Sequence, residues 1–155
     1  MKYIQGDILS NLPNNKPVLI LHGCNCFHTM GAGIAKYLSS RYPQILEADK
    51  KFGPKGDNLK LGWCCYVMLN EHLYIANCYT QYHYGKRFGP PVNYSAIESC
   101  LLRAGKVVPK SYEIRSPKIG CGLAGGDWNV VEPLFEKYLP NAIIYEKKET
   151  YHYGK

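Results

Sequence analysis

Two glycine-rich stretches carry the residues whose types and spacing could do chemistry. Residues 22–35 (HGCNCFHTMGAGIA) follow an apolar run at 18–21 and lead into a helical pattern, and residues 118–128 (KIGCGLAGGDW) repeat this strand, loop and helix arrangement. Glycine permits tight backbone turns, and the first N–H groups of a helix have no internal partners and lie at the positive end of its dipole. Either stretch alone fits a plain tight turn. Together they predict a clamp for the two phosphates of a diphosphate.

The cysteines indicate a reduced core rather than a metal site. There are seven, an odd number, and five lie in or beside apolar segments: Cys24, Cys64, Cys65, Cys78 and Cys100. Buried free thiols behave as small apolar groups in a reducing compartment. The spacing Cys24-x-Cys26-x-His28 offers zinc-ligand types, but no second pair stands at ligand spacing. We therefore predict no metal.

Length, composition and charge narrow the class of protein. The chain has 155 residues, of which 46% are hydrophobic and 20% charged, which fits one folded domain over residues 1–155. The sequence shows neither a signal peptide nor a membrane-spanning run, so we expect a cytoplasmic, monomeric protein in a reducing compartment. The net charge of +7 favours an anionic partner. Lys and Arg are spread along the chain, which weakens the nucleic-acid alternative without removing it.

The apolar periodicities alternate between strand and helix. We predict strands at 2–5, 17–22, 61–69, 73–79, 112–119 and 142–145, helices at 34–41, 43–53, 93–105 and after Asp127, and an irregular segment at 80–91. Pro117 indicates a bulge or a sheet edge. Residues 146–155 are predicted to form a flexible tail. This order gives an α/β fold, predicted as three α/β/α layers around a mixed six-stranded sheet.

Three motifs in this order resemble a macro domain. They are Gly6-Asp7-Ile8-Leu9, Asn25 followed by Met-Gly-Ala-Gly-Ile-Ala at 30–35, and IGCGLAGGDW at 119–128. The likeness covers residues 2 to about 145. The chain is similar to the branch that holds ADP-ribose 1''-phosphate phosphatases, terminal ADP-ribose-protein glycohydrolases and antitoxin macro domains. Residues 77–85 and 93–97 resemble its small bacterial and phage members.

The resemblance implies that ADP-ribose lies across the strand ends. Asp7 would accept a hydrogen bond from the adenine amino group, with the Ile8 N–H nearby, while Asn25 would hold the distal ribose and Gln81 would lie near it. The implied diphosphate contacts are Gly31, Ala32, Gly33, Ile34, Gly120, Cys121, Gly122, Leu123, Ala124, Gly125 and Gly126.

Two positions depart from the glycohydrolase pattern. Gln81 stands where glycohydrolases of this branch have a lysine, and Ala124 stands where some have an aspartate. Both departures disfavour a lysine-dependent deglycosylase. They favour a phosphatase or a non-catalytic reader.

The predicted catalytic residues are His28, Asn25 and Asp127. His28 is the candidate acid or base because its ordinary pKa is near working pH, but an exposed loop histidine would look the same. Asp127 would equally serve as a helix cap, and His22 better fits a buried core histidine. Cys26 and Cys121 have no charge partner in the sequence, which disfavours a thiolate nucleophile.

The predicted function is hydrolysis of ADP-ribose 1''-phosphate to ADP-ribose and phosphate, without a cofactor. The alternatives are a reader of ADP-ribose or ADP-ribosylated targets, an ADP-ribosyl hydrolase that uses no lysine, and a nucleic-acid-binding protein. The expected partners are therefore ADP-ribose or its 1''-phosphate, and ADP-ribosylated protein or nucleic acid, with no membrane.

Overall fold

The computed structural model describes residues 1–147, so the predicted tail at 148–155 lies outside the described residues. The elements run in the order β1(Lys2–Gln5), β2(Val18–Cys24), α1(Gly33–Arg41), α2(Gln44–Lys51), a short 3-10 helix (Asn58–Lys60), β3(Cys64–Asn70), β4(Leu73–Tyr79), α3(Tyr94–Val107), β5(Glu113–Ser116), α4(Trp128–Tyr138) and β6(Ile143–Glu146). They form a six-stranded sheet in the order β1-β6-β5-β2-β4-β3. Only β3 is antiparallel to its neighbour, which confirms the predicted mixed sheet.

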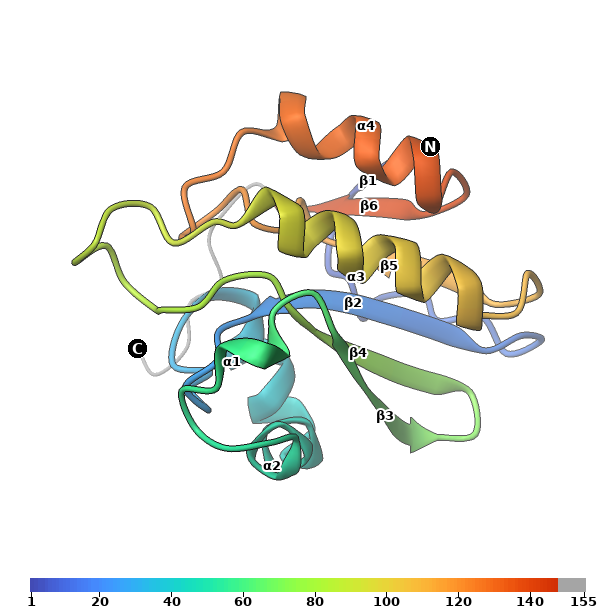
Figure 1. The fold of residues 1–155 in the computed structure, drawn as a ribbon. Helices are drawn as coiled ribbons and strands as arrows, with labels where there is room; N and C mark the ends of the chain where they lie inside the picture. Colours follow the sequence, from blue (N-terminus) through green and yellow to red (C-terminus); the bar gives the residue numbers. More distant parts are fainter. Residues whose placement is uncertain (148–155) are drawn as a thin grey trace.

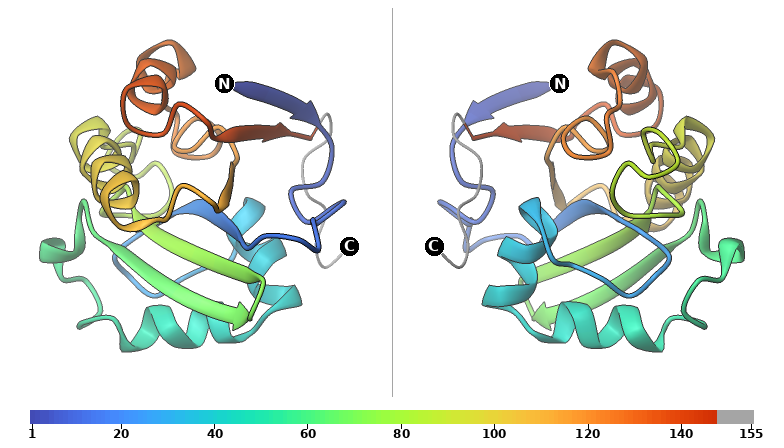
Figure 2. Two further views of the ribbon diagram at one scale, coloured as in Figure 1. Left: turned by 90° about the vertical axis from the view of Figure 1, so that its right-hand side faces the viewer. Right: turned by 90° about the vertical axis from the view of Figure 1, so that its left-hand side faces the viewer.

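Helices cover both faces of the sheet, as Figures 1 and 2 show. Successive side chains of a strand point to opposite faces, and β2 is apolar on both: Leu19 and Leu21 pack in one core with α3 and α4. Val18 and Ile20 pack in the other core with α1 and α2. The predicted three-layer α/β/α architecture is therefore confirmed.

The candidate loops all lie at the carboxyl ends of the parallel strands. The strands β1, β6, β5, β2 and β4 run parallel to one another, so their carboxyl ends lie on the same side. The segments that follow these ends include residues 6–10, 25–32, 80–93 and 117–127. Open α/β sheets bind their ligands at the carboxyl ends of their strands.

Two predictions about strand ends are wrong. Pro117 marks neither a bulge nor a sheet edge: β5 lies between β6 and β2, and it ends at Ser116 because proline cannot donate the next ladder hydrogen bond. Glu146 is not part of a tail, since it belongs to β6, pairs with Gln5 and accepts a hydrogen bond from the Gly6 N–H at 2.8 Å.

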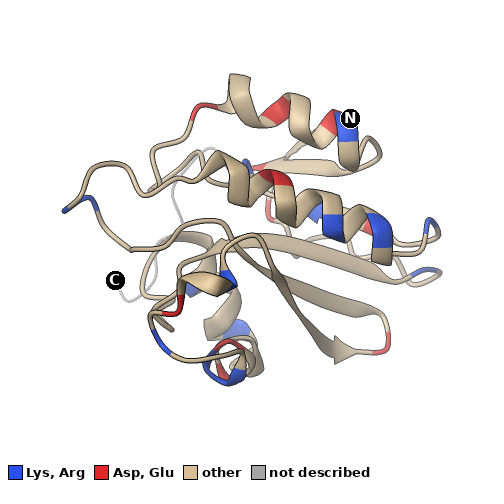
Figure 3. Cartoon of the chain, viewed as in Figure 1, with Lys and Arg blue, Asp and Glu red and all other residues tan. Residues whose placement is uncertain are grey.

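The basic residues are spread over the fold, as they are along the sequence. Lys and Arg lie on α2, α3 and several loops rather than on one element, as Figure 3 shows. Within residues 1–147, no helix has both the length and the apolar character needed to cross a bilayer.

Candidate functional site

Asp7 is held by two donors at the end of β1. Its Oδ1 accepts from the Leu9 N–H at 2.9 Å, and its Oδ2 accepts from the Tyr37 hydroxyl of α1. Arg41 Nη1 in turn donates to the Tyr37 hydroxyl oxygen at 3.3 Å. A carboxylate offers about four acceptor sites, so Asp7 keeps capacity for a further donor. Tyr37 thus orients the carboxylate that the resemblance assigns to adenine.

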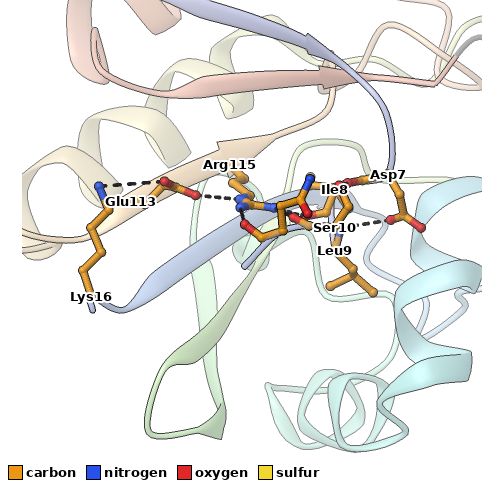
Figure 4. A network of polar contacts seen from close by, with 8 residues as sticks. Asp7, Ile8, Leu9, Ser10, Lys16, Glu113 and Arg115 are labelled. Atoms are coloured by element: carbon orange, nitrogen blue, oxygen red, sulfur yellow. Dashed lines mark hydrogen bonds and ion pairs between the residues drawn. The ribbon is translucent and has the colours of Figure 1, made fainter. Parts of the chain in front are cut away.

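A buried guanidinium fixes the backbone that follows that carboxylate. Arg115 is 2% exposed, and its Nη1 donates to the carbonyls of Ile8 at 2.9 Å and Ser10 at 2.5 Å. Its Nη2 donates to the Asn11 carbonyl. Its Nε donates to Glu113, as Figure 4 shows. Arg115 was not predicted from the sequence, although a charged residue inside a strand needs partners once it is buried.

The first glycine loop presents backbone donors that have no partner among residues 1–147. Gly33 opens α1 with φ +59°. Within residues 1–147, the N–H groups of residues 31–35 donate no hydrogen bond, and the first bond of the turn runs from Lys36 N to Ala32 O at 3.3 Å. These N–H groups lie at the positive end of the α1 dipole.

The second glycine loop is folded on itself and leaves three successive donors open. Gly125 N bonds to Gly122 O at 3.0 Å, and Gly126 N bonds to Gly120 O at 2.8 Å. Across the described chain, the N–H groups of residues 122–124 make no hydrogen bond. A Cβ on Gly126 would stand 2.4 Å from Gly120 O, so only glycine permits this turn. Successive open N–H groups of this kind form an anion-binding concavity.

The two glycine loops meet. The Leu123 Cδ1 atom lies 3.4 Å from the position that a Cβ on Gly33 would take. The structure therefore brings together the two stretches that the sequence predicted to clamp a diphosphate. Tyr37, in the same helix as Gly33, extends this surface to Asp7.

The loops after β2 and β4 pair directly. Cys26 N donates to Tyr82 O at 3.0 Å. The Asn25 Nδ2 donates to Thr29 Oγ1 at 2.8 Å and its Oδ1 accepts from Phe27 N. Gln81 Nε2 donates to the backbone of the same loop, at the carbonyl of residue 83. Asn25 and Gln81 are thus brought together, and both amides shape their own loops.

Aromatic rings join these loops further. Phe27 stacks on His83 with ring centroids 5.0 Å apart and planes 12° apart, and it meets Tyr82 edge to face. A cavity of about 150 Å³ lies beside this group, lined by Tyr82, His83, Gly85, Phe88, Gly89, Pro91, Val92 and Asn93. The irregular segment at 80–91 is therefore packed against the loop that carries Asn25.

His28 faces a buried lysine. Its Nε2 lies 2.9 Å from Lys60 Nζ, and Lys60 is only 4% exposed. An ammonium group donates and cannot accept, so Nε2 must be the acceptor and the ring proton is assigned to Nδ1. His28 also has φ +59°, a left-handed conformation that histidine tolerates better than most residues. No pattern in the sequence pointed to Lys60, which lies in the 3-10 helix Asn58–Lys60.

Two other candidates serve the fold in this structure. Asp127 caps α4 by accepting from Asn129 N at 2.9 Å, and it is exposed. Among the described residues it contacts neither His28 nor Asn25. His22 is fully buried, its Nε2 lies 2.6 Å from Asn77 Oδ1, and burial lowers its pKa to about 4.

The two loop cysteines are poor nucleophiles here. Burial raises the pKa of Cys26 to about 11, and burial likewise raises the pKa of Cys121 to about 11. Both thiols therefore stay protonated near neutral pH. Cys24, Cys64, Cys65, Cys78 and Cys100 are buried free thiols, as the sequence predicted.

Known proteins align with this chain over most of its length. No protein-family model matches it. An uncharacterized 17.5 kDa protein of Enterobacteria phage T4 is 38% identical over 149 residues, which cover 89% of each chain. An ADP-ribose 1''-phosphate phosphatase of Candida albicans is 25% identical over 89% of this chain and 93% of its own. A macrodomain protein of Streptomyces coelicolor is 29% identical with a TM-score of 0.72, covering 94% of this chain and 97% of that one. With the glycine loops in the same fold, the chain belongs to the macrodomain family.

Proposed function

We propose that the protein binds ADP-ribose along the carboxyl ends of its parallel strands. The observation that carries this proposal is the meeting of two loops with open backbone donors, at Gly33 and Leu123. Diphosphate oxygens are acceptors only, and several N–H groups converging on them bind them without a lysine or arginine. The adenine amino group would donate to Asp7, whose carboxylate is already oriented by Tyr37.

We further propose that the protein hydrolyses ADP-ribose 1''-phosphate. Relatives named for this activity align with about nine-tenths of the chain, at identities near 25%. Water would attack phosphorus, the bond from phosphorus to the sugar oxygen would break, and that oxygen would take a proton. Asn25, His28 and Gln81 follow the strand ends nearest to the implied distal ribose.

In this proposal His28 is the proton donor. With Nε2 accepting from Lys60, the free ring nitrogen is Nδ1, which carries the proton. As Nδ1 gives its proton to the leaving oxygen, Nε2 takes one from the Lys60 ammonium, so the ring stays neutral. The amine of Lys60 then regains a proton from solvent. Asp127 has no part in this scheme, because its carboxylate caps α4.

One observation favours a reader without catalysis as the second candidate. Both ends of the Asn25 amide are bonded inside their own loop, to Thr29 and to Phe27. A side chain engaged in this way shapes the pocket and has less freedom to position water. The reader would bind ADP-ribose or ADP-ribosylated targets through the same glycine loops.

Calorimetric titration with ADP-ribose tests the binding proposal. We expect micromolar affinity, about −8 kcal/mol, reduced about 10- to 100-fold in Asp7→Asn, because a charge-assisted hydrogen bond to adenine is lost. Asp57→Asn is the matched control, since Asp57 Oδ1 also accepts from the N–H two residues on, at 2.9 Å. An equal effect of both substitutions would contradict the adenine role of Asp7.

Phosphate release from ADP-ribose 1''-phosphate then separates the two candidates. The phosphatase predicts turnover that Asp7→Asn slows at low substrate and Asp57→Asn leaves unchanged. The reader predicts tight binding of ADP-ribose without release of phosphate. No binding of ADP-ribose would overturn both.

A further inference from the structure

Three cysteine thiols outside the proposed ADP-ribose site converge in the core under α3. Cys64 comes from β3, Cys78 from β4 and Cys100 from α3, and their Sγ atoms all lie within 4.8 Å of one another. The Sγ atoms of Cys64 and Cys78 are 3.7 Å apart. All three side chains are buried, and none contributes to the loops described above.

The backbone fixes this convergence before any ligand is bound. Cys64 and Cys78 are directly opposite in the antiparallel β3–β4 pair, next to the Tyr79 N to Trp63 O hydrogen bond. Such opposed residues have their Cβ atoms about 5 Å apart on one face of the sheet. Cys100 closes the group from the helix that packs on that face. Sulfur ligands held in this way need little ordering on binding.

The spacing suits one zinc ion. Zinc binds thiolate sulfur at about 2.3 Å, so sulfurs around one ion lie about 3.8–4.0 Å apart in tetrahedral or trigonal geometry. Among the described residues, no fourth His, Cys, Asp or Glu joins the group. The Trp63 carbonyl oxygen lies 3.4 Å from Cys100 Sγ. A carbonyl oxygen and a thiolate on one tetrahedral zinc would be about 3.6 Å apart.

A neighbouring guanidinium balances the charge of such a site. Three thiolates and Zn²⁺ leave one net negative charge, which is costly in a buried position unless it is paired. The Arg103 guanidinium carbon lies 3.4 Å from the centroid of the Trp63 ring, and Trp63 directly precedes Cys64 in the chain. The Arg103 Nε is buried without a hydrogen-bond partner in the described part of the chain.

We propose that Cys64, Cys78 and Cys100 form a zinc-binding site that ties the β3–β4 hairpin to α3. This site lies outside the proposed ADP-ribose site, and the zinc proposal does not depend on ADP-ribose binding. No metal was expected from the sequence because recognisable zinc motifs place their ligands at short spacing, whereas these three cysteines lie 14 and 22 residues apart along the chain. Soft thiolate ligands select zinc over magnesium or calcium.

Titration of the reduced, metal-free protein with Cd²⁺ and then Zn²⁺ tests this site. We expect one equivalent of Cd²⁺ to give a thiolate-to-metal charge-transfer band, and Zn²⁺ to displace it with sub-micromolar affinity. Cys78→Ala and Cys100→Ala should each abolish the band. Cys65→Ala is the matched control, because Cys65 follows Cys64 in β3 and packs in the opposite core, and it should keep the full band.

A second measurement covers variants that fold poorly. Zn²⁺ should raise the thermal unfolding midpoint of the wild-type protein and of Cys65→Ala, and should leave that of Cys64→Ser unchanged. Absence of any Cd²⁺ or Zn²⁺ binding by the folded wild-type protein would overturn the proposal. So would a full equivalent of Cd²⁺ bound by all three cluster variants.

Discussion

Lys60 Nζ lies 2.9 Å from His28 Nε2, in contact with a residue 32 positions earlier in the chain. Lys60 is 4% exposed, and its ammonium also lies 5.2 Å from the centroid of the Tyr79 ring. A buried ammonium that donates to one ring nitrogen fixes both the orientation and the tautomer of the histidine. Under the proposed mechanism we therefore expect Lys60 to position His28 and supply its proton, without contacting the ligand.

Lys60→Met tests this role, because methionine keeps most of the apolar stem and removes the donor. We expect kcat for phosphate release from ADP-ribose 1''-phosphate to fall about 10-fold or more, with ADP-ribose affinity within about twofold of wild type. His28→Asn, which tolerates the left-handed backbone, should lower kcat similarly. In the His28→Asn background, Lys60→Met should have no further effect on kcat. Additive losses in the double variant would show that Lys60 acts independently of His28.

Substitutions at Gly122 and Gly120, in the second glycine loop, should affect different quantities: ADP-ribose affinity at Gly122 and the free energy of unfolding at Gly120. A Cβ on Gly122 would meet nothing within 4 Å, so Gly122→Val should leave the free energy of unfolding within about 0.5 kcal/mol. The valine would instead fill the space in front of the open N–H groups, and ADP-ribose affinity should fall at least about 10-fold. Denaturant unfolding and calorimetry measure the two quantities separately.

Gly120→Ala is the counterpart to Gly122→Val. Gly120 has φ +73°, and its Cβ would stand 2.7 Å from Ile97 Cδ1 in the core. We expect this substitution to lower the free energy of unfolding by about 2 kcal/mol. A stable Gly120→Ala protein, or wild-type affinity in Gly122→Val, would contradict these assignments.

Arg115 predicts a link between stability and adenine binding. Its guanidinium donates to three backbone carbonyls beside Asp7, a pattern that the single ammonium of lysine cannot reproduce. Arg115→Lys should lower the free energy of unfolding by about 3 kcal/mol and weaken ADP-ribose binding. Lys16→Ala is the control, because Lys16 is exposed and lies 3.9 Å from Glu113, so its loss should change stability by less than about 1 kcal/mol.

The diphosphate loops could be predicted from the sequence because the residues that define each loop are neighbours along the chain. Glycines between a strand and a helix reveal both the turn and the open donors, and parallel strands bring such loops to one edge. Lys60, Arg115 and Tyr37 were not predicted because their roles depend on partners far away in the chain. Cys64 and Cys78 lie equally far from the predicted hairpin turn, but Cys100 joins them only when α3 docks on the sheet.

His22 predicts how stability depends on pH. Burial lowers its folded-state pKa to about 4 from an ordinary value of 6.5, although the Asn77 hydrogen bond opposes the shift. Protonation therefore favours the unfolded chain. The contribution of neutral His22 to the free energy of unfolding totals about 3 kcal/mol. It is fully present above about pH 6.5 and is lost as the pH falls from 6.5 to about 4.

Urea unfolding of the wild-type protein and of His22→Gln, measured between pH 7.5 and about pH 4, tests this dependence. Glutamine does not titrate, and its amide can still donate to Asn77 Oδ1, so the variant should lose less stability than wild type over this range. The difference between the two slopes isolates His22 from the carboxylates, which titrate in both proteins. Equal slopes would contradict this prediction. They would mean that His22 takes up a proton in the folded state at its ordinary pKa, despite its full burial beside Asn77.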